Sequence, residues 1–254
     1  MSLSNQILRP RGWLDAYDRV VLADKPVAYW KMNETYGTVL YDLSDHAQNL
    51  NIGAGVALNQ AALLQNGASM FFNGPIITGT VPAFPQQAST ATGATYECVV
   101  SAHATYGVIL WLGNAFVGGR PSYYCPIIWV DGSGSLCLAD TWSGTPSIVS
   151  SLDLLTAGPQ HVIFTTDIAA GIASCYVQGK QLASVSSTAT ANIIWSDASN
   201  IAIGVGYCDG WSNTNGGLGY WNGSASHVSV YAKPFDASKA KTHYNALRTS
   251  PKYV

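Results

Sequence analysis

Hydrophobic and polar residues alternate with a period of two along most of the chain, in short runs that end at Gly, Pro, Asn or Asp. The clearest runs cover residues 96–101, 107–112, 161–165 and 201–204, and they are rich in β-branched and aromatic side chains. Alternation of this kind is typical of half-buried β-strands. Because turn signals separate the runs roughly every 8–12 residues, as in a sandwich, the pattern predicts an all-β fold.

Two β-hairpins are predicted where residues that tolerate positive φ separate apolar strands. The first covers residues 127–139 and turns at Asp131-Gly132-Ser133-Gly134. The second covers residues 174–185 and turns at Gln178-Gly179-Lys180. Each hairpin places two strands that are close in the sequence side by side in a sheet.

Helical spacing of apolar residues occurs only near the two ends of the chain. Asp236 is an N-cap candidate that precedes an apolar stripe of Ala237, Ala240, Tyr244 and Leu247. A similar stripe, formed by Leu14, Tyr17 and Val21, precedes Pro26, and the proline predicts the end of that element. The longest predicted loop covers residues 78–93. We therefore expect short helices near both termini and none between them.

Several segments, in order along the chain, resemble laminin-G-like, concanavalin A-like jelly-roll domains, especially those in bacteriophage and bacterial surface proteins. They include residues 17–34 with the pair Tyr29-Trp30, residues 41–44, 68–74 and 175–182, and the stretch from His227 to Tyr244. The resemblance covers about residues 17–246. It implies a two-sheet antiparallel jelly-roll sandwich with ligand sites on its rim loops. We divide the chain into an N-terminal docking arm (1–22), the jelly roll (23–247) and a C-terminal tail (248–254).

Charge is scarce and unevenly placed. The chain has 12 basic and 14 acidic residues, a net charge of -2, and 48% hydrophobic residues. This composition argues against disorder and against a nucleic-acid-binding surface, and no apolar run approaches the roughly 20 residues of a membrane span. Residues 1–31 hold five basic and three acidic groups, residues 233–254 five and one, and residues 32–232 two and ten. Basic ends of this kind favour docking on an acidic partner. The alternative is that the uneven charge reflects chance variation in composition and has no function.

The N-terminal arm is predicted to dock on other virion proteins or on further copies of the chain. Its arginines would meet carboxylates and its apolar residues would bury surface that a free monomer exposes. These residues are Ile7, Leu8, Arg9, Arg11, Trp13, Leu14 and Arg19. No secretory signal is visible before them, which agrees with a protein that folds in a host cytoplasm and joins a particle there.

The residues that enzymes of this fold use are poorly represented. Glycoside hydrolases generally need two carboxylates roughly 5–10 Å apart, and Glu34 and Glu97 are the only glutamates. The chain also lacks the Glu-x-Asp-x-x-Glu triplet of the laminarinase-like branch and a G-x-S-x-G elbow. The five histidines, including His161 and His227, are interpreted as satisfied structural residues. We therefore expect no enzymatic activity, with a hydrolase based on two aspartates as the alternative.

No cofactor is expected, although the resemblance implies calcium as a metal to test. Asp42 and Asp45 are the first ligands to examine, because rim carboxylates and carbonyls suit this cation. Many family members carry an Asp-Glu pair where this chain has Ser226-His227, which argues against a calcium site. The five cysteines have no C-x-x-C pair, so buried thiols are favoured over a soft-metal site.

The stretch 206–223 is the strongest candidate for recognition. It combines large aromatics, on which sugar rings stack, with amides and a carboxylate that bind hydroxyls. The candidate residues are Tyr207, Asp209, Trp211, Asn213, Asn215, Tyr220 and Trp221. Trp211 and Trp221 are assigned as the stacking faces, so that replacing both by alanine removes binding without affecting stability. The alternative is that these aromatics fill a core or a subunit interface. A lesser candidate is the segment 118–124 with Arg120.

Together these features predict a non-enzymatic structural virion protein, such as a capsid decoration, fibre or tail-surface component, that displays a jelly roll for host-surface glycans. It would act in an oligomer or larger assembly, with no nucleic acid bound and no membrane insertion. The alternatives are a bacterial surface or secreted carbohydrate-binding lectin module, located outside the cell, and a glycoside hydrolase.

Overall fold

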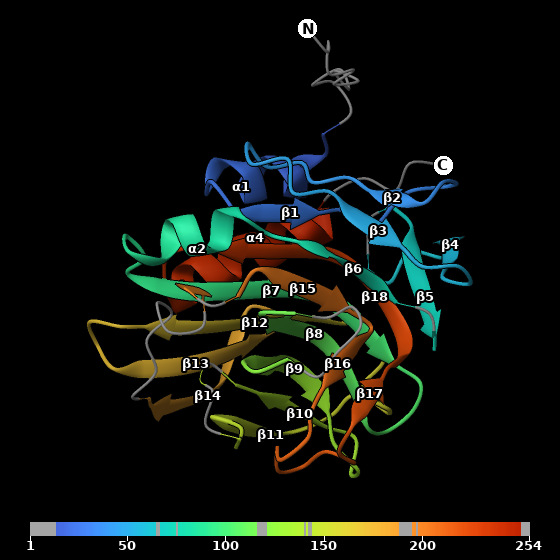
Figure 1. Ribbon diagram of the computed structural model, residues 1–254. Coiled ribbons are helices and arrows are strands. Elements are labelled where there is room, and N and C mark those ends of the chain that lie inside the picture. The colour runs from blue at the N-terminus through green and yellow to red at the C-terminus, as the bar shows by residue number, and fades with distance from the viewer. Residues whose placement is uncertain are drawn as a thin grey trace, which may run out of the picture.

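The computed structural model describes residues 14–64, 67–74, 76–115, 121–139, 141, 144–187, 195–196 and 198–249. Within these residues, two antiparallel sheets of eight strands each pack face to face, and a two-stranded sheet lies beside them (Figure 1). The arrangement is a jelly-roll β-sandwich, which confirms the fold class predicted from the sequence. No helix in the described part of the chain has the length and apolar character needed to cross a bilayer.

The first sheet, here called the helix-side sheet, has the strand order β14-β13-β12-β7-β18-β5-β4, with β1 paired to β18. Its strands are β1 (Ala28–Trp30), β4 (Ala57–Gln60), β5 (Ser69–Asn73), β7 (Gly93–Ala102), β12 (Gln160–Asp167), β13 (Ile172–Val177), β14 (Lys180–Ser186) and β18 (Asn222–Tyr231).

The second sheet, here called the ribbon-side sheet, has the order β11-β10-β9-β8-β15-β6-β3-β2. Its strands are β2 (Val39–Leu40), β3 (Leu50–Ile52), β6 (Ile77–Thr80), β8 (Gly107–Gly113), β9 (Tyr124–Val130), β10 (Ser135–Leu138), β11 (Ile148–Asp153) and β15 (Asn200–Ile203). Strands β16 (Val205–Tyr207) and β17 (Leu218–Tyr220) form the separate two-stranded sheet, which we call the ribbon.

Both predicted hairpins are present. Strands β9 and β10 pair antiparallel around the turn at Asp131, and Gly134 adopts φ +84° there. Strands β13 and β14 pair around Gln178 and Gly179, whose φ values are +52° and +70°. The left-handed backbone is the reason that glycine and amide residues occupy these turns.

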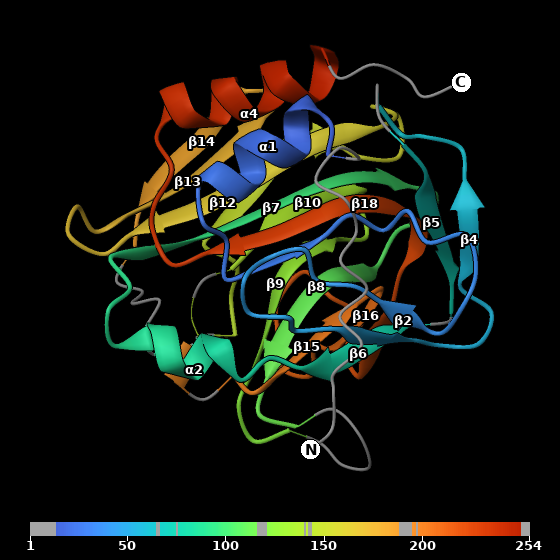
Figure 2. The same ribbon diagram turned by 90° about the horizontal axis from the view of Figure 1, so that it is seen from above.

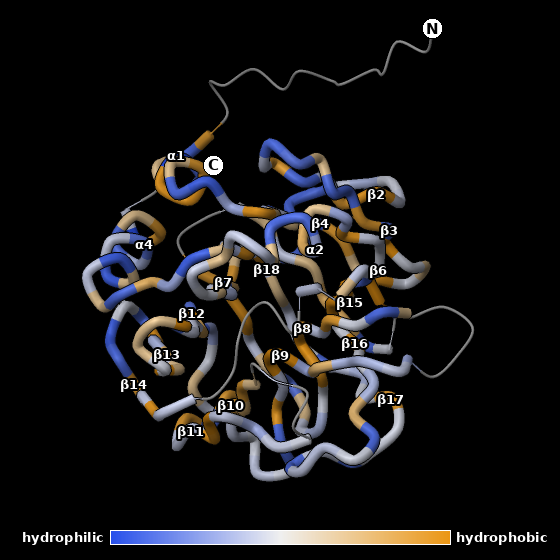
Figure 3. The backbone as a smooth tube through the Cα atoms, turned by 60° about the vertical axis from the view of Figure 1, so that its left-hand side comes forward, coloured by the Kyte–Doolittle hydropathy of each residue, from blue (hydrophilic) through white to orange (hydrophobic). Residues whose placement is uncertain are grey.

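The main core lies between the two sheets, and the period-two pattern explains which side chains reach it. On β7, Tyr96, Cys98 and Val100 face this core, and on β12 Val162 and Phe164 do so. The intervening residues of both strands face the other side of the helix-side sheet. Strongly hydrophobic segments therefore gather in the strands of the interior, whereas α4 is largely hydrophilic (Figure 3).

Two helices cover the outer face of the helix-side sheet: α1 (Ala16–Ala23) and α4 (Ala237–Thr249) (Figure 2). They enclose a second core, distinct from the first, that includes Tyr17, Val21, Tyr29, Val99, Ile163, Tyr231, Phe235 and Leu247. Asp15 caps α1 in a reciprocal capping box with Asp18. The helices predicted near the two termini are thus confirmed, and each packs on the sheet rather than standing free.

The packing of α1 corrects the proposed boundary of the docking arm at residue 22. Tyr17 and Val21 are fully buried against the helix-side sheet, so residues 15–23 belong to the domain. Arg19 is exposed, and its guanidinium donates to the carbonyl of Leu14 at 2.9 Å rather than to a carboxylate. The candidates Ile7, Leu8, Arg9, Arg11 and Trp13 lie outside the described residues.

The predicted loop at residues 78–93 also needs correction. It contains the end of β6 and a short helix, α2 (Ala83–Ala88), so helix is not confined to the two ends of the chain. Phe84 of this helix is fully buried and stacks on Trp195 with 5.1 Å between ring centroids. This six-residue helix buries the Phe84 ring, although the Pro and Ser content of residues 78–93 indicated a loop.

Candidate ligand-binding surface

The ribbon β16–β17 lies over the outer face of the ribbon-side sheet, and two glycines allow its close approach. A Cβ atom on Gly206 would lie 2.5 Å from the Trp111 ring, and one on Gly219 would lie 3.1 Å from Val108 Cγ2. Any side chain at Gly206 would therefore clash with β8. The two glycines face each other across the ribbon, in register. They define its inner side, and on β17 the residues before and after Gly219, Leu218 and Tyr220, are exposed on the opposite side.

The loop between the two ribbon strands, residues 208–217, continues this cover over β9. Trp129 of β9 donates from its indole Nε1 to the Asn213 carbonyl oxygen at 3.1 Å. The Trp211 ring packs edge-on against Trp129 with 5.8 Å between centroids. Strands β8 and β9 are consequently buried on both faces along nearly their whole length.

The stacking role assigned to Trp211 and Trp221 is therefore wrong. Trp211 is 7% exposed and Trp221 is fully buried. Trp221 packs against Phe72 with 5.6 Å between ring centroids, and Gly107 leaves the space for its backbone and ring. Both indoles belong to the hydrophobic core, and neither presents a free face to a sugar.

Other residues of the candidate set do lie on the outer side of the ribbon. Tyr220 is 50% exposed, and Leu218, two residues earlier on the same face of β17, is 36% exposed. Tyr207 faces Leu218 across the ribbon and is half-buried against Tyr124. Asn213 and Asn215 are exposed in the connecting loop. These residues form a continuous set of aromatic, aliphatic and amide groups, which we call the ribbon face.

Asp209 mainly holds the loop in shape. Its carboxylate accepts a hydrogen bond from the Gly217 N–H across the loop, and its carbonyl oxygen accepts one from the Tyr124 hydroxyl at 2.6 Å. Thr214 closes the loop further, because its hydroxyl donates to the carbonyl oxygens of Cys208 and Trp211. The loop is thus fixed by internal hydrogen bonds, which reduces the entropy that ligand binding would otherwise cost.

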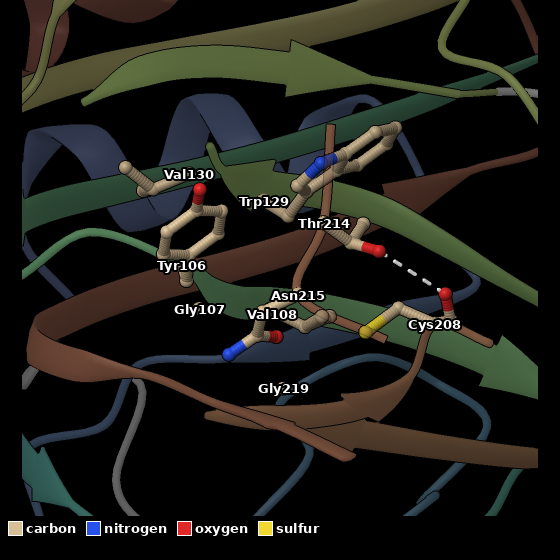
Figure 4. Close-up of a pocket in the computed structure, with 9 residues that line it drawn as sticks. All are labelled: Tyr106, Gly107, Val108, Trp129, Val130, Cys208, Thr214, Asn215 and Gly219. Carbon is tan, nitrogen blue, oxygen red and sulfur yellow. Dashed lines mark hydrogen bonds between the residues drawn. The ribbon is translucent and has the colours of Figure 1, made fainter. Parts of the chain in front are cut away.

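A small hollow opens beside the ribbon face, lined on one side by Tyr106 and Val130 and on the other by Thr214 and Asn215 (Figure 4). Its cavity volume is about 10 Å³, room for about one water molecule. Pockets that enclose a small molecule usually have roughly 300–1,000 Å³. The hollow is therefore too small to surround a sugar ring, and a ligand here would bind against the surface, with one substituent in the hollow.

The largest cluster of ionisable groups lies elsewhere, between the helix-side sheet and its two helices. Glu97 on β7 is fully buried, and its carboxylate accepts from the hydroxyls of Tyr17 (2.7 Å), Ser229 (3.0 Å) and Tyr231 (2.8 Å). It also contacts ring nitrogens of His161 at 2.7 Å and His243 at 3.0 Å. The other ring nitrogen of His243 lies 2.9 Å from Asp24, which in turn pairs with Lys233 and Lys239.

The pKa values in this cluster follow from those contacts. Burial alone would raise the pKa of Glu97, but the charge of His243 and the hydrogen bonds from the two histidines hold it well below its ordinary value. Burial alone would lower the pKa of His243, but Glu97 and Asp24 raise it to about 9. The cluster therefore holds a buried carboxylate and imidazolium that bind α1 and α4 to the sheet.

The remaining metal candidates predicted from the sequence are two aspartates and the cysteines. Asp42 accepts hydrogen bonds from the backbone N–H groups of Tyr29, Ser44 and Gln48, and Asp45 is exposed beside it. The expectation that no calcium is bound there stays a prediction. All five cysteines are buried and free of disulfides, as expected, and burial raises the pKa of the Cys137 and Cys175 thiols to about 12.

No protein-family model matches the chain, and no curated protein does. Among solved structures, the binding domain of botulinum neurotoxin DC in complex with rat synaptotagmin II is similar, with a TM-score of 0.61 and 14% identity over 90% of this chain and 53% of that chain. The same domain in complex with SialylT gives 0.58 and 13%, with the same coverage of 90% and 53%.

Trypanosoma rangeli sialidase in complex with the inhibitor DANA gives a TM-score of 0.52 and 14% identity, over 85% of this chain and 32% of that chain. This chain therefore spans about half of the neurotoxin domains and about a third of the sialidase. At such low identity the likeness shows a shared β-sandwich fold, and function has to be argued from the residues of this chain.

Proposed function

We propose that this chain is a non-enzymatic structural protein of a virion surface and that its ribbon face binds host-surface glycans. The observation that supports glycan binding is the outward Tyr220–Leu218 face beside the amides of Asn213 and Asn215, on a loop fixed by its own hydrogen bonds. An aromatic face stacks on the C–H side of a sugar ring, and amides bind its hydroxyls. The binding of SialylT by a domain of the same fold supports this proposal.

The glycans should be neutral. Residues 181–232, which include the whole ribbon face, contain no Lys or Arg, and Asp209 contributes a carboxylate to the loop. An anionic sugar would lose hydration here without gaining a cationic partner. Neutral sugars meet no such penalty, so we expect them to bind in preference to sialylated ones.

A binding role without catalysis agrees with the placement of the two glutamates. Glu97 is enclosed by five side-chain partners in the second core, and Glu34 is buried with its carboxylate accepting the Tyr41 N–H. Neither belongs to the ribbon face or lines the hollow beside it.

Replacing Tyr220 by alanine is the direct test of the ribbon face. Single-site lectin affinities are commonly millimolar, about −4 kcal/mol, so binding should be measured with a multivalent form of the protein on an array of neutral and sialylated glycans. We expect Tyr220→Ala to reduce the signal for neutral glycans at least about tenfold, because stacking of roughly 1.4 kcal/mol or more is lost. Tyr36→Ala is the matched control, since Tyr36 is 86% exposed on the connection between β1 and β2. Equal binding by both variants would exclude the ribbon face.

The virion role is tested separately. The basic N-terminal residues 1–13 would dock on an acidic partner in the particle, while the domain faces outward. Deletion of residues 1–13 is expected to leave the melting temperature of the domain unchanged, because Asp15 and the helix that it caps are kept, and to abolish incorporation into particles. Electron microscopy of particles assembled with the shortened chain measures this directly. Full occupancy by the shortened chain would contradict the docking role.

A further inference from the structure

A second buried cluster lies where α1 meets β1 and β18. The carboxylates of Asp15 and Asp18 both contact the Lys31 ammonium, at 2.8 and 2.6 Å. A ring nitrogen of His227 and one oxygen of each carboxylate all lie within 4.8 Å of one another. The N-terminal end of α1 and strand β18, which are distant in the sequence, thus bring two carboxylates and one imidazole to a single point. The glycan-binding ribbon face makes no use of this cluster.

His227 is unusual among the histidines of the chain, and it departs from the satisfied residue that the sequence suggested. It is 1% exposed, and neither of its ring nitrogens has a hydrogen-bond partner among the described residues. A buried polar group in this state is destabilising unless something binds it. Its backbone also adopts φ +53°, in an irregular part of β18. A backbone of this kind persists only where the surrounding structure fixes it.

The segment that follows β1 also contains a non-glycine residue with positive φ. Met32 adopts φ +60°, and the His227 N–H donates to the carbonyl oxygen of Lys31, the residue before Met32. Two non-glycine residues in the left-handed conformation, Met32 and His227, therefore lie close to the two aspartates. The backbone is irregular on both segments that bring Lys31 and His227 to Asp15 and Asp18.

We propose that Asp15, Asp18 and His227 form a binding site for a divalent transition metal, of which zinc is the best fit, and that the metal replaces the Lys31 ammonium. Two carboxylates and one imidazole are a ligand set that zinc accepts, with a fourth position left for water. Calcium and magnesium prefer oxygen ligands alone.

The geometry and the charge balance are compatible with this exchange. Zinc bonds of about 2.0–2.2 Å place tetrahedral ligand atoms roughly 3.4 Å apart, so the three side chains would close by small rotations. Lys31 supplies one positive charge to two carboxylates, whereas a divalent ion neutralises both. The Lys31 side chain is 9% exposed, so metal binding would have to move its ammonium out of a buried site.

Titration of the full chain with zinc at neutral pH, followed by calorimetry and by the visible absorption of a cobalt-substituted sample, tests the proposal. We expect the unmodified protein to bind one metal ion, with an intense cobalt spectrum that indicates four-coordination. Loss of a group that only orients a ligand costs about 10–100-fold in metal affinity, so His227→Ala should cost at least about 100-fold. Lys31→Met should bind metal more tightly than the unmodified protein, because the competing ammonium is gone.

Two further measurements make the test specific to this cluster. His46→Ala is the matched control, since His46 is exposed beside Asp45 and would bind zinc adventitiously. If Lys31→Met does not fold without metal, its recovery on addition of zinc is read from the melting temperature instead. The proposal is overturned if neither the unmodified protein nor Lys31→Met binds metal, if His227→Ala binds as tightly as the unmodified protein, or if only His46→Ala loses binding. In each case the cluster holds a bridging water or no ligand at all.

Discussion

Replacing Glu97 by glutamine is expected to lower the free energy of unfolding by about 3–5 kcal/mol, the usual cost of removing one partner from a buried ion pair. Glutamine has nearly the same shape as glutamate, so the effect comes from charge and hydrogen bonding rather than from a cavity. The buried imidazolium of His243 would lose its main counter-ion, and the hydroxyls of Tyr17 and Tyr231 would compete for a weaker acceptor. Because these groups connect α1 and α4 to the sheet, both helices should loosen together.

Chemical denaturation followed by circular dichroism measures this loss, and the sequence offers a matched control. Glu34 is the only other glutamate, and it is also buried, but its carboxylate accepts the backbone N–H of Tyr41 at the rim of the domain. We expect Glu34→Gln to cost about 1 kcal/mol or less, because the glutamine carbonyl oxygen can still accept the Tyr41 N–H. Equal destabilisation by the two variants would show that the Glu97 cluster has no special role.

The same cluster predicts how stability depends on pH. The pKa of His243 is about 9 in the folded protein, against an ordinary value of 6.5. A group with a raised pKa contributes stability that is complete below pH 6.5 and is lost as the pH rises through about 9. The difference corresponds to roughly 3 kcal/mol. Unfolding measured from pH 6 to 10 should show this decline in the unmodified protein and a much smaller one in Glu97→Gln.

The strands of this protein could be predicted from the sequence because their signals are local. The alternation at 96–101 and 161–165 predicted strands that the structure has as β7 and β12, and the turns of the two hairpins needed only glycine, amide and aspartate positions. The helix α2 was missed for the opposite reason. It is short, follows Pro82 and is stabilised by the burial of Phe84 against Trp195, a residue far along the chain.

The Glu97 cluster could not be predicted from single motifs, because its members come from α1, β7, β12, β18 and α4. One signal was nevertheless present in the sequence. Glu97 lies between Tyr96 and Cys98 in a largely apolar strand, and His161 begins the run at 161–165 on the neighbouring strand, opposite Val99. Polar residues on one face of two buried strands indicate a covered polar cluster rather than an exposed edge.

The error over Trp211 and Trp221 has a similar cause. Composition shows that a loop contains aromatics and glycines, but it does not show which face of the ribbon each residue occupies. Gly206 and Gly219 form the inner face of the ribbon, and their lack of side chains lets it approach β8. Once that face is known, alternation places Leu218 and Tyr220 outside and leaves Trp221 to enter the core at the start of β18.

Replacing Trp221 by alanine is therefore expected to lower the free energy of unfolding by about 3–5 kcal/mol, the usual cost of removing a buried indole. The indole packs against Phe72 between the two sheets. The backbones at Gly107 and Gly223 also lie directly against Trp221, so removal of the indole would leave a cavity. Any loss of glycan binding in this variant would follow from disorder of the ribbon, because the indole presents no surface to a ligand.

Tyr220→Ala is the matched comparison for Trp221→Ala, because the two aromatics are adjacent in the chain and face opposite ways. Tyr220 is 50% exposed, so its removal should cost less than about 1 kcal/mol of stability while it reduces binding. Thermal unfolding and glycan-array binding of the two variants separate the roles. If Trp221→Ala melted at the temperature of the unmodified protein and lost only glycan binding, the indole would have to leave the core and face the ligand. The buried position of Trp221 would then not be the state that binds.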